Sequence, residues 1–179
     1  MDRKFIICDI DGVLIDTSWI WGFVQRYPIK DKSQVWDFFN RNCNAAINGI
    51  DKVCSNFVKN LANERECGIY FLTARSERVA LETREFLKKK LGFDVSKCNF
   101  SFRKESDNES SVVSKQNRLK LLKNLGYEFE VAIDDDRNIC DMYSRNGIET
   151  VINWQLGSIP TGVVALYAQD DKLNQLLRG

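Results

Sequence analysis

Short runs of consecutive apolar residues recur along the chain. Four such runs cover 5–8, 68–73, 130–134 and 148–152, and a weaker one covers 99–102. Apolar runs of this length, without alternation, are typical of strands that are buried on both faces of a parallel sheet. The pattern therefore predicts four parallel strands and one weaker candidate.

Between these runs, apolar residues recur at helical spacing over 76–91, 114–125 and 137–145. A glycine stands just beyond the end of each segment, where helices commonly stop. These residues are Gly92, Gly126 and Gly147. Because strands alternate with helices, the sequence predicts an α/β fold, a Rossmann-like parallel sheet with helices on both faces.

Residues 16–64 break the alternation, since they are helical in pattern and contain no clear strand. They are also rich in aromatic side chains, namely Trp19, Trp21, Phe23, Tyr27, Trp36, Phe38 and Phe39. We interpret this segment as a small helical cap, inserted over one end of the sheet of a single domain that spans 1–179. The last twenty or so residues are expected to form a short extended stretch and a final helix.

Polar side chains stand where three of the predicted strands end, at Asp9, at Thr73 and at 134–136. The carboxyl ends of parallel strands line the ligand crevice of such sheets. The three adjacent aspartates of 134–136 repel one another unless a cation or basic groups neutralise them. A hard dication bound by oxygen ligands is the natural solution, and beside a phosphate that ion is usually magnesium. The sequence thus predicts a Mg²⁺ site.

Asp9 and Asp11 stand two residues apart in the string Asp-Ile-Asp-Gly. One carboxylate can attack phosphorus while the other protonates the leaving oxygen and later deprotonates water. A turn or a helix cap is the alternative interpretation, because Asp and Gly are common there. The transferred phosphoryl group also needs donors, and Thr73 and Lys115 are the candidates. Arg118 and Lys120 are rivals of Lys115.

Composition excludes several kinds of chemistry. The chain has no histidine, which removes Ser-His-Asp and Cys-His nucleophile systems and HExxH zinc sites. Its net charge of +1 indicates neither a nucleic-acid nor a membrane partner. The six scattered cysteines lack metal-ligand spacing and are expected to be buried free thiols in a reducing compartment. With no signal peptide recognisable in the first residues, a cytoplasmic location is expected.

Four motifs in order resemble the signatures of the haloacid dehalogenase (HAD) superfamily. They are FIICDIDGVL, FLTAR, Lys115 and VAIDDDR, between about residues 5 and 137. The resemblance implies that Asp9 is the nucleophile and Asp11 the acid/base. It also implies that Mg²⁺ binds the Asp9 carboxylate, the backbone carbonyl of Asp11 and an aspartate of the fourth motif. That ligand is expected to be Asp135, with Asp134 and Asp136 supporting it, although the family usually has two acids where this chain has three.

The resemblance narrows toward the 3′-phosphatase domain of bacteriophage polynucleotide kinase/phosphatases. VAIDDDRNICDMYSRNGIETV resembles the closing segment of that domain, and SFRKE followed by VVSK resembles its substrate-arginine and lysine region. By position, Arg75 and Arg103 are expected to hold the substrate phosphate or to scaffold its site. No GxxxxGK[ST] loop is present, so ATP-dependent kinase activity is not expected.

The function expected from these features is a Mg²⁺-dependent phosphomonoesterase that forms an aspartyl-phosphate intermediate and removes 3′-phosphates from polynucleotide ends. The enzyme alternative is a 5′(3′)-nucleotidase or another small-metabolite phosphatase of the same superfamily. An inactive HAD-fold binding module is the alternative of another class, and the presence of both Asp9 and Asp11 argues against it. The aromatic residues of 16–64 could stack on bases, or they could simply form a core.

Overall fold

The computed structural model describes residues 4–158 apart from 28, 30, 46 and 47. Its centre is a five-stranded sheet in which every neighbouring pair of strands is parallel. In spatial order the strands are β5 (Cys98–Arg103), β4 (Gly68–Ser76), β1 (Lys4–Cys8), β6 (Glu128–Asp134) and β7 (Thr150–Asn153). The apolar runs therefore form strands as predicted, including the weaker one. The final helix expected near the C-terminus falls outside the described residues.

The central strand β1 is buried on both faces, which explains its unbroken apolar run. Ile6 and Cys8 belong to the core on one face of the sheet, and Phe5 and Ile7 belong to the core on the other. Because successive side chains of a strand point to opposite faces, both faces need apolar residues. A strand of this kind requires helices on both sides of the sheet.

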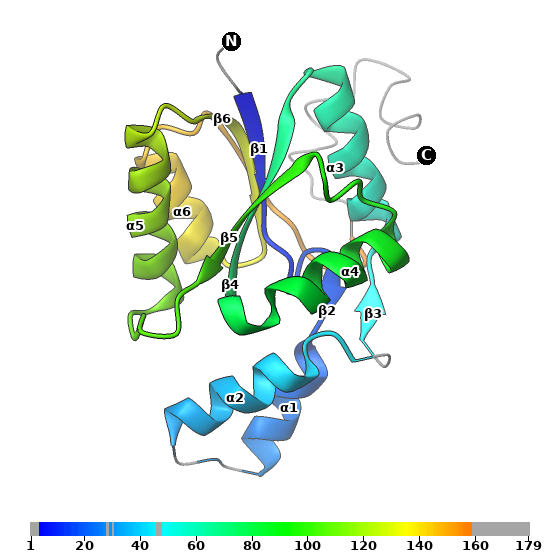
Figure 1. Ribbon diagram of the computed structural model, residues 1–179, viewed down its shortest axis with the longest axis vertical. Helices are drawn as coiled ribbons and strands as arrows, with labels where there is room; N and C mark the ends of the chain where they lie inside the picture. Colours follow the sequence, from blue (N-terminus) through cyan, green and yellow to red (C-terminus); the bar gives the residue numbers. More distant parts are fainter. Residues whose placement is uncertain (1–3, 28, 30, 46–47, 159–179) are drawn as a thin grey trace.

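Helices cover the two faces of the sheet in pairs (Figure 1). Residues of α3 (Lys52–Glu64) and α4 (Ala80–Leu91) pack into the first core, and residues of α5 (Ser111–Asn124) and α6 (Arg137–Arg145) pack into the second. The segment predicted as one helix over 76–91 divides into the short η1 (Glu77–Val79) and α4. The predicted α/β architecture, a parallel sheet flanked by helices, is confirmed.

Two helices lie outside these layers, α1 (Ser18–Arg26) and α2 (Lys32–Asn42). We call the part of the chain that contains them the excursion. Figure 1 shows them beyond the carboxyl ends of the strands. They share a small core of their own, in which Ile20, Phe39 and Cys43 are buried. A two-stranded antiparallel ribbon closes the base of this excursion, with β2 (Ile15–Asp16) on one side and β3 (Gly49–Ile50) on the other.

The third helix of the segment 16–64 belongs to the sheet layer. Phe57, Val58 and Leu61 of α3 are buried in the core that also contains Ile6 of β1. We therefore propose that the insertion is shorter than the predicted 16–64 and covers 17–48, between β2 and β3. The division of the chain into a single domain with one insertion stays a prediction.

Strand order determines where a ligand can bind. The chain runs from β1 outward through β4 to β5, and then returns to β6 on the opposite side of β1. In open parallel sheets, the crevice at such a switch point receives the ligand. Here it lies at the carboxyl ends of β1 and β6, which α1 and α2 face (Figure 1).

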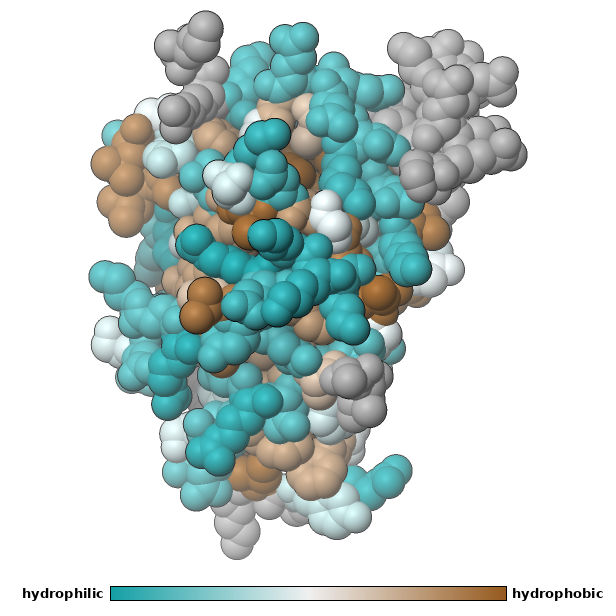
Figure 2. Space-filling view, turned by 45° about the vertical axis from the view of Figure 1, so that its right-hand side comes forward, coloured by the Kyte–Doolittle hydropathy of each residue, from teal (hydrophilic) through white to brown (hydrophobic). Residues whose placement is uncertain are grey.

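Three further observations concern the thiols, the helices and the surface of the molecule. All six cysteines are free thiols as predicted, although Cys67 and Cys98 are only partly buried. Among the described residues, no helix combines the length and hydropathy that crossing a bilayer requires. Figure 2 shows some apolar surface on the lower part of the molecule. Trp21 and Phe23 of α1 are among the exposed large apolar side chains.

Candidate active site

Asp9 stands one residue beyond β1, and its backbone N–H donates to the carbonyl of Ile133 in β6 at 2.9 Å. Only 6% of the residue is exposed. Its Oδ2 lies 2.8 Å from Nζ of Lys115, whereas its Oδ1 is buried and has no hydrogen-bond partner among the described residues. A buried carboxylate oxygen without a donor is costly, so this atom is the one that a ligand would satisfy.

Lys115 connects two carboxylates from the first turns of α5. Its Nζ lies 2.8 Å from Asp9 and 2.7 Å from Oδ2 of Asp134. Burial by itself would lower the pKa of Lys115, but Asp134 and Asp9 outweigh it, and the pKa lies well above its ordinary value. Lys115 therefore stays protonated. Of the three cations considered from the sequence, it is the one that contacts Asp9, whereas Lys120 is exposed.

The three consecutive aspartates have different surroundings. Asp134 is fully buried against Lys115, and its Oδ1 accepts the backbone N–H of Asp136 at 3.2 Å. Asp135 is partly exposed and lines the cavity described below. Asp136 caps α6, because its carboxylate accepts the N–H of Asn138 at 2.8 Å. Asp135 and Asp136 both line the cavity, and of these two it is Asp135 whose carboxylate clusters with that of Asp9.

Gly12 makes room for Asp135. A Cβ atom at position 12 would stand 2.1 Å from Oδ2 of Asp135, and Gly12 has a φ of +79°. Any other residue would both adopt a strained backbone and displace the carboxylate. The glycine of the Asp-Ile-Asp-Gly string is thus required by the position of an aspartate 123 residues further along the chain.

The acidic groups fit a hard dication. Carboxylate oxygens of Asp9, Asp134 and Asp135 lie within 4.8 Å of one another. Burial and the neighbouring Asp9 raise the pKa of Asp134 to about 7 and that of Asp135 to about 6, against the opposing effect of Lys115. Three carboxylates thus surround the ammonium group of Lys115, and Asp9 Oδ1 has no hydrogen-bond partner among the described residues. Oxygen ligands in this arrangement suit magnesium, and Asp9 and Asp135 are the members of the cluster that also line the cavity.

Arg75 holds the side chain of Asp11. Its Nε and Nη2 donate to the two Asp11 carboxylate oxygens at 2.8 and 2.7 Å. The remaining donors reach Asn44, Thr83 and the backbone carbonyl of Cys43. A guanidinium has five N–H groups, so all of them are used, and Arg75 is fully buried. Of the two roles expected for Arg75, this geometry favours scaffolding over contact with a substrate phosphate.

Thr73 ends the apolar part of β4 and is fully buried. Its hydroxyl accepts the N–H of Arg75 at 3.1 Å, and its carbonyl accepts Nη1 of Arg118 at 2.9 Å. The same Nη1 donates to the carbonyl of Ser101 in β5 at 2.7 Å. Ala74, rather than Thr73, lines the cavity. Arg118 therefore joins β4 and β5, while the substrate contact predicted for Thr73 stays a prediction.

A cavity of about 540 Å³ opens above these groups. Asp9, Asp11, Asp135 and Lys115 form its polar floor. Aromatic rings from the two excursion helices form the opposite wall: Trp21, Trp36 and Phe39. Trp19 is turned elsewhere, since its indole N–H donates to Asn48 and its ring packs edge-on against Phe38. The excursion thus supplies an aromatic wall to the cavity.

Arg103 stands at the end of β5 and is 8% exposed. Its Nε donates to the carbonyl of Asp107 at 3.0 Å, and its Nη2 donates to the carbonyl of Glu109. Its guanidinium carbon lies 5.5 Å from the centre of the Trp36 ring. Arg103 does not line the cavity above Asp9; it fixes the polar loop that follows β5.

Several residues that orient the site were not singled out by the sequence. Asn44 and Thr83 hold Arg75, and their isolated polar side chains give no signal in a helix or a loop. Asn153 donates to the carbonyl of Asp135 at 2.8 Å. Because Asn153 is the last residue of β7, the strand-end argument applied to Asp9 and Thr73 could have found it.

Comparison with known proteins gives a fold but no near relative. No protein-family model matches the chain, and no curated protein matches it either. Among solved structures, a chain of the Pnkp1/Rnl/Hen1 RNA repair complex is similar over 88% of this chain, with 18% identity and a TM-score of 0.60. This chain spans only 44% of the length of that one.

Two further structures match along nearly the whole chain. The HAD domain of effector protein Lem4 from Legionella pneumophila has a TM-score of 0.54 and 14% identity, over 97% of this chain and 99% of that domain. The class C acid phosphatase from Bacillus anthracis has a TM-score of 0.57 and 13% identity, over 98% of this chain and 78% of that one. At these identities the likeness concerns the fold, and the chain has a HAD-like α/β fold.

Proposed function

We propose that the protein is a magnesium-dependent phosphomonoesterase with Asp9 as its nucleophile. The observation that carries the proposal is the state of the Asp9 carboxylate. One of its oxygens is 2.8 Å from the ammonium group of Lys115, and the other is buried with no donor among the residues that the structure describes. Asp9 lies at the floor of a cavity that Asp135 and Asp11 also line.

In the proposed reaction, a carboxylate oxygen of Asp9 attacks phosphorus and the ester oxygen leaves with a proton from Asp11. This step gives an aspartyl phosphate on Asp9 and the free alcohol. Asp11, now ionised, then takes a proton from the water that attacks the aspartyl phosphate, which releases inorganic phosphate and restores both side chains. Arg75 orients Asp11 during both steps through its two hydrogen bonds to the carboxylate.

Charge on the transferred phosphoryl group is offset from two sides. When bound, Mg²⁺ would supply positive charge beside the phosphoryl oxygens, with Asp9, Asp135 and the backbone carbonyl of Asp11 as its protein ligands. Lys115 places a protonated ammonium group within 2.8 Å of Asp9. Such fixed charges act strongly where the surroundings exclude water.

The proposed substrate is the 3′-phosphorylated end of a nucleic acid. The aromatic wall of Trp21, Trp36 and Phe39 supports it, because bases stack on such rings. So does the similarity to a chain of an RNA repair complex, which is at the level of fold. A 5′(3′)-nucleotidase is the second candidate, since about 540 Å³ is also the volume of a pocket for one small ligand.

The test is phosphate release from a panel of substrates: 3′-phosphorylated oligonucleotides, free 3′-nucleotides and free 5′-nucleotides. Wild type and Asp9→Asn are compared with Mg²⁺ and after chelation. The proposal requires release that depends on Asp9 and on the metal. Release by Asp9→Asn at the wild-type rate would refute it, and a preference for free nucleotides would favour the nucleotidase.

A further inference from the structure

A second hollow of about 230 Å³ adjoins the cavity above Asp9. Trp36 and Ala74 line both hollows, so the two share a wall. The second one is bounded otherwise by α2, the end of β4 and the loop after β5, and apart from Trp36 it contains none of the residues to which the proposed function assigns a role. The second hollow could therefore bind a part of a ligand other than the reacting phosphate.

An aromatic ring with a fixed cation forms one side of this second hollow. Arg103 lines it and lies 5.5 Å from the centre of the Trp36 ring. The guanidinium cannot swing away freely, because the carbonyls of Asp107 and Glu109 accept its N–H groups. A planar ring and a planar guanidinium of fixed orientation are a suitable platform for a nucleobase.

Charge in the second hollow favours an anion. The acids that line it, Glu105 and Asp107, are engaged: Glu105 pairs with Arg78 at 2.8 Å, and Asp107 accepts the hydroxyl of Ser114 and lies 3.5 Å from Arg103. Lys104 also lines the hollow, is exposed and forms no ion pair with any residue between 4 and 158 that the structure describes. Its ammonium group is available to a phosphate.

We propose that the second hollow is a subsite for the nucleotide next to the phosphorylated end of a single-stranded nucleic acid. Two adjoining hollows with a shared aromatic wall suit a ligand that repeats base and phosphate. Lys104 contacts the internucleotide phosphate, and Trp36 with Arg103 receives the base. This inference rests on the proposed phosphatase function, and it makes the enzyme a reader of strand ends rather than of free nucleotides.

Chain length provides the first test. The wild-type enzyme hydrolyses a 3′-phosphorylated mononucleotide, dinucleotide and trinucleotide, with p-nitrophenyl phosphate as a reference ester. We expect kcat/KM to rise about tenfold or more from mononucleotide to dinucleotide, where the second hollow is filled, and to change little beyond it. Equal kcat/KM for all three lengths would overturn the subsite.

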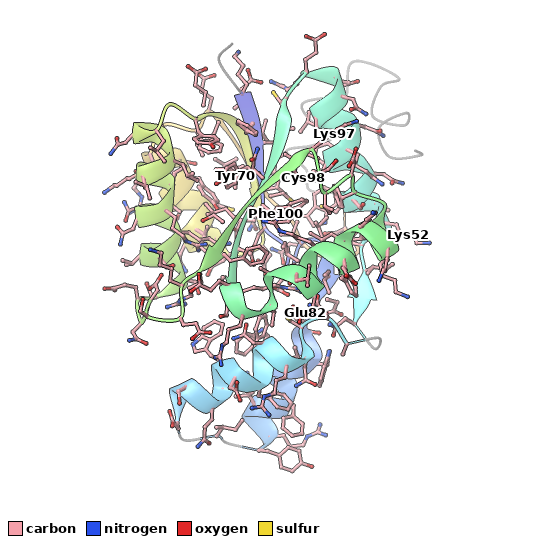
Figure 3. All side chains as sticks on the ribbon, viewed as in Figure 1. Lys52, Tyr70, Glu82, Lys97, Cys98 and Phe100 are labelled. Atoms are coloured by element: carbon pink, nitrogen blue, oxygen red, sulfur yellow. The ribbon has the colours of Figure 1, made fainter. Side chains whose placement is uncertain are left out.

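Lys104 provides the second test, with Lys97 as the matched control. Lys97 stands just before the start of β5, far from α1 and α2 (Figure 3). Lys104→Ala should lower kcat/KM for the dinucleotide about fivefold to tenfold more than for the p-nitrophenyl ester. Lys104→Arg should retain most of the dinucleotide activity, and Lys97→Ala should leave both substrates at wild-type values.

Salt dependence separates a phosphate contact from a structural effect. Loss of one phosphate contact reduces the slope of log affinity against log salt concentration by about 0.7 for a single strand. We expect this reduction for Lys104→Ala when a fluorescent 3′-phosphorylated trinucleotide binds to the inactive Asp9→Asn background. An unchanged slope, or equal losses on both substrates, would overturn the role of Lys104.

The outcomes also separate this inference from the proposed function. If p-nitrophenyl phosphate and the mononucleotide are hydrolysed in an Asp9-dependent way without any effect of chain length, the subsite is wrong and the phosphatase stands. If no 3′-phosphate or ester is hydrolysed with dependence on Asp9, the phosphatase is wrong and the subsite is refuted with it.

Discussion

At the scale of single residues, the carboxylate of Asp9 is the group on which the proposed chemistry depends. Asp9→Asn keeps the shape of the side chain but replaces an attacking oxygen by an amide. We expect turnover to fall by several powers of ten, which corresponds to roughly 5 kcal/mol or more at about 1.4 kcal/mol per decade. Phosphate release from p-nitrophenyl phosphate measures the loss, and far-UV circular dichroism checks that the variant is folded. Activity within tenfold of wild type would remove Asp9 from this role.

A substitution at Arg75 can distinguish orientation of Asp11 from substrate binding, because the five donors of Arg75 are already occupied by the protein. Arg75→Lys keeps the charge but loses the paired contact with Asp11. If Arg75 only orients Asp11, kcat should fall about a hundredfold, the size of a typical acid/base contribution, while KM changes little.

A substrate-binding Arg75 would give the opposite pattern, a raised KM. Asn44→Ala is the control variant, since it removes one acceptor from Arg75 and leaves Asp11 paired. It should reduce kcat much less than Arg75→Lys does. Urea unfolding of both variants separates a change in rate from a change in the free energy of unfolding.

At the scale of elements, the sequence predicted the sheet better than the excursion. The part of β1 that is buried on both faces, 5–8, consists of apolar residues alone, so the unbroken apolar run identifies the strand without knowledge of its partners. The apolar stripe of α3 has the same period whether it covers a sheet or another helix, so its place on the sheet could not be predicted. β2 and β3 have two residues each, too few for any period to be recognised.

The two tryptophans of α1 have different roles in the structure. Trp21 lines the cavity and is 38% exposed, whereas Trp19 packs in the small core of the excursion and donates to Asn48. Trp21→Ala should therefore raise KM for a 3′-phosphorylated oligonucleotide about tenfold, the size of one lost base–ring contact. It should affect glycerol phosphate, which has no ring, much less.

Trp19→Ala is expected to act through stability. It removes a large side chain that packs against the core of the excursion, so the free energy of unfolding should fall by about 3 kcal/mol. Thermal unfolding, together with kinetics on the 3′-phosphorylated oligonucleotide and on glycerol phosphate, distinguishes Trp19→Ala from Trp21→Ala. A KM effect that is equal for both esters in Trp21→Ala would contradict a base contact.

At the scale of the whole molecule, the candidate site is assembled from segments far apart in the chain. Asp9 and Asp135 could be selected from the sequence, because strand ends and charge repulsion mark them and the parallel sheet brings them together. Lys115 could be selected only as one of three candidate cations, and its contact with Asp9 distinguishes it from the other two. The residues around Arg75 could not be selected from the sequence. Asn44 belongs to the excursion and Thr83 to α4, and no local sequence pattern shows that these two elements pack against Arg75. The catalytic roles themselves remain predictions until activity is measured.

Magnesium should stabilise the whole fold as well as permit turnover. A ligand that binds only the native state adds about 2.7 kcal/mol at a concentration of one hundred times its Kd. Wild type should therefore unfold at a higher temperature with Mg²⁺ than after chelation. Asp135→Asn should lose most of this shift, because it removes a carboxylate that lines the cavity beside Asp9. Asp136→Asn should keep it, since Asp136 caps α6 and Asn is also a good cap.

Calorimetry provides a readout that does not depend on activity, and calcium provides the contrast. Calcium should raise the unfolding temperature as well, because its ligands are also oxygens, yet support turnover poorly, because its larger and looser shell misplaces Asp9 relative to phosphorus. Full phosphatase activity after exhaustive chelation would refute the metal site. An Asp135→Asn variant that retains the whole Mg²⁺-dependent shift would instead place the ion elsewhere, and Asp134, which Lys115 already neutralises in part, would become the ligand to test.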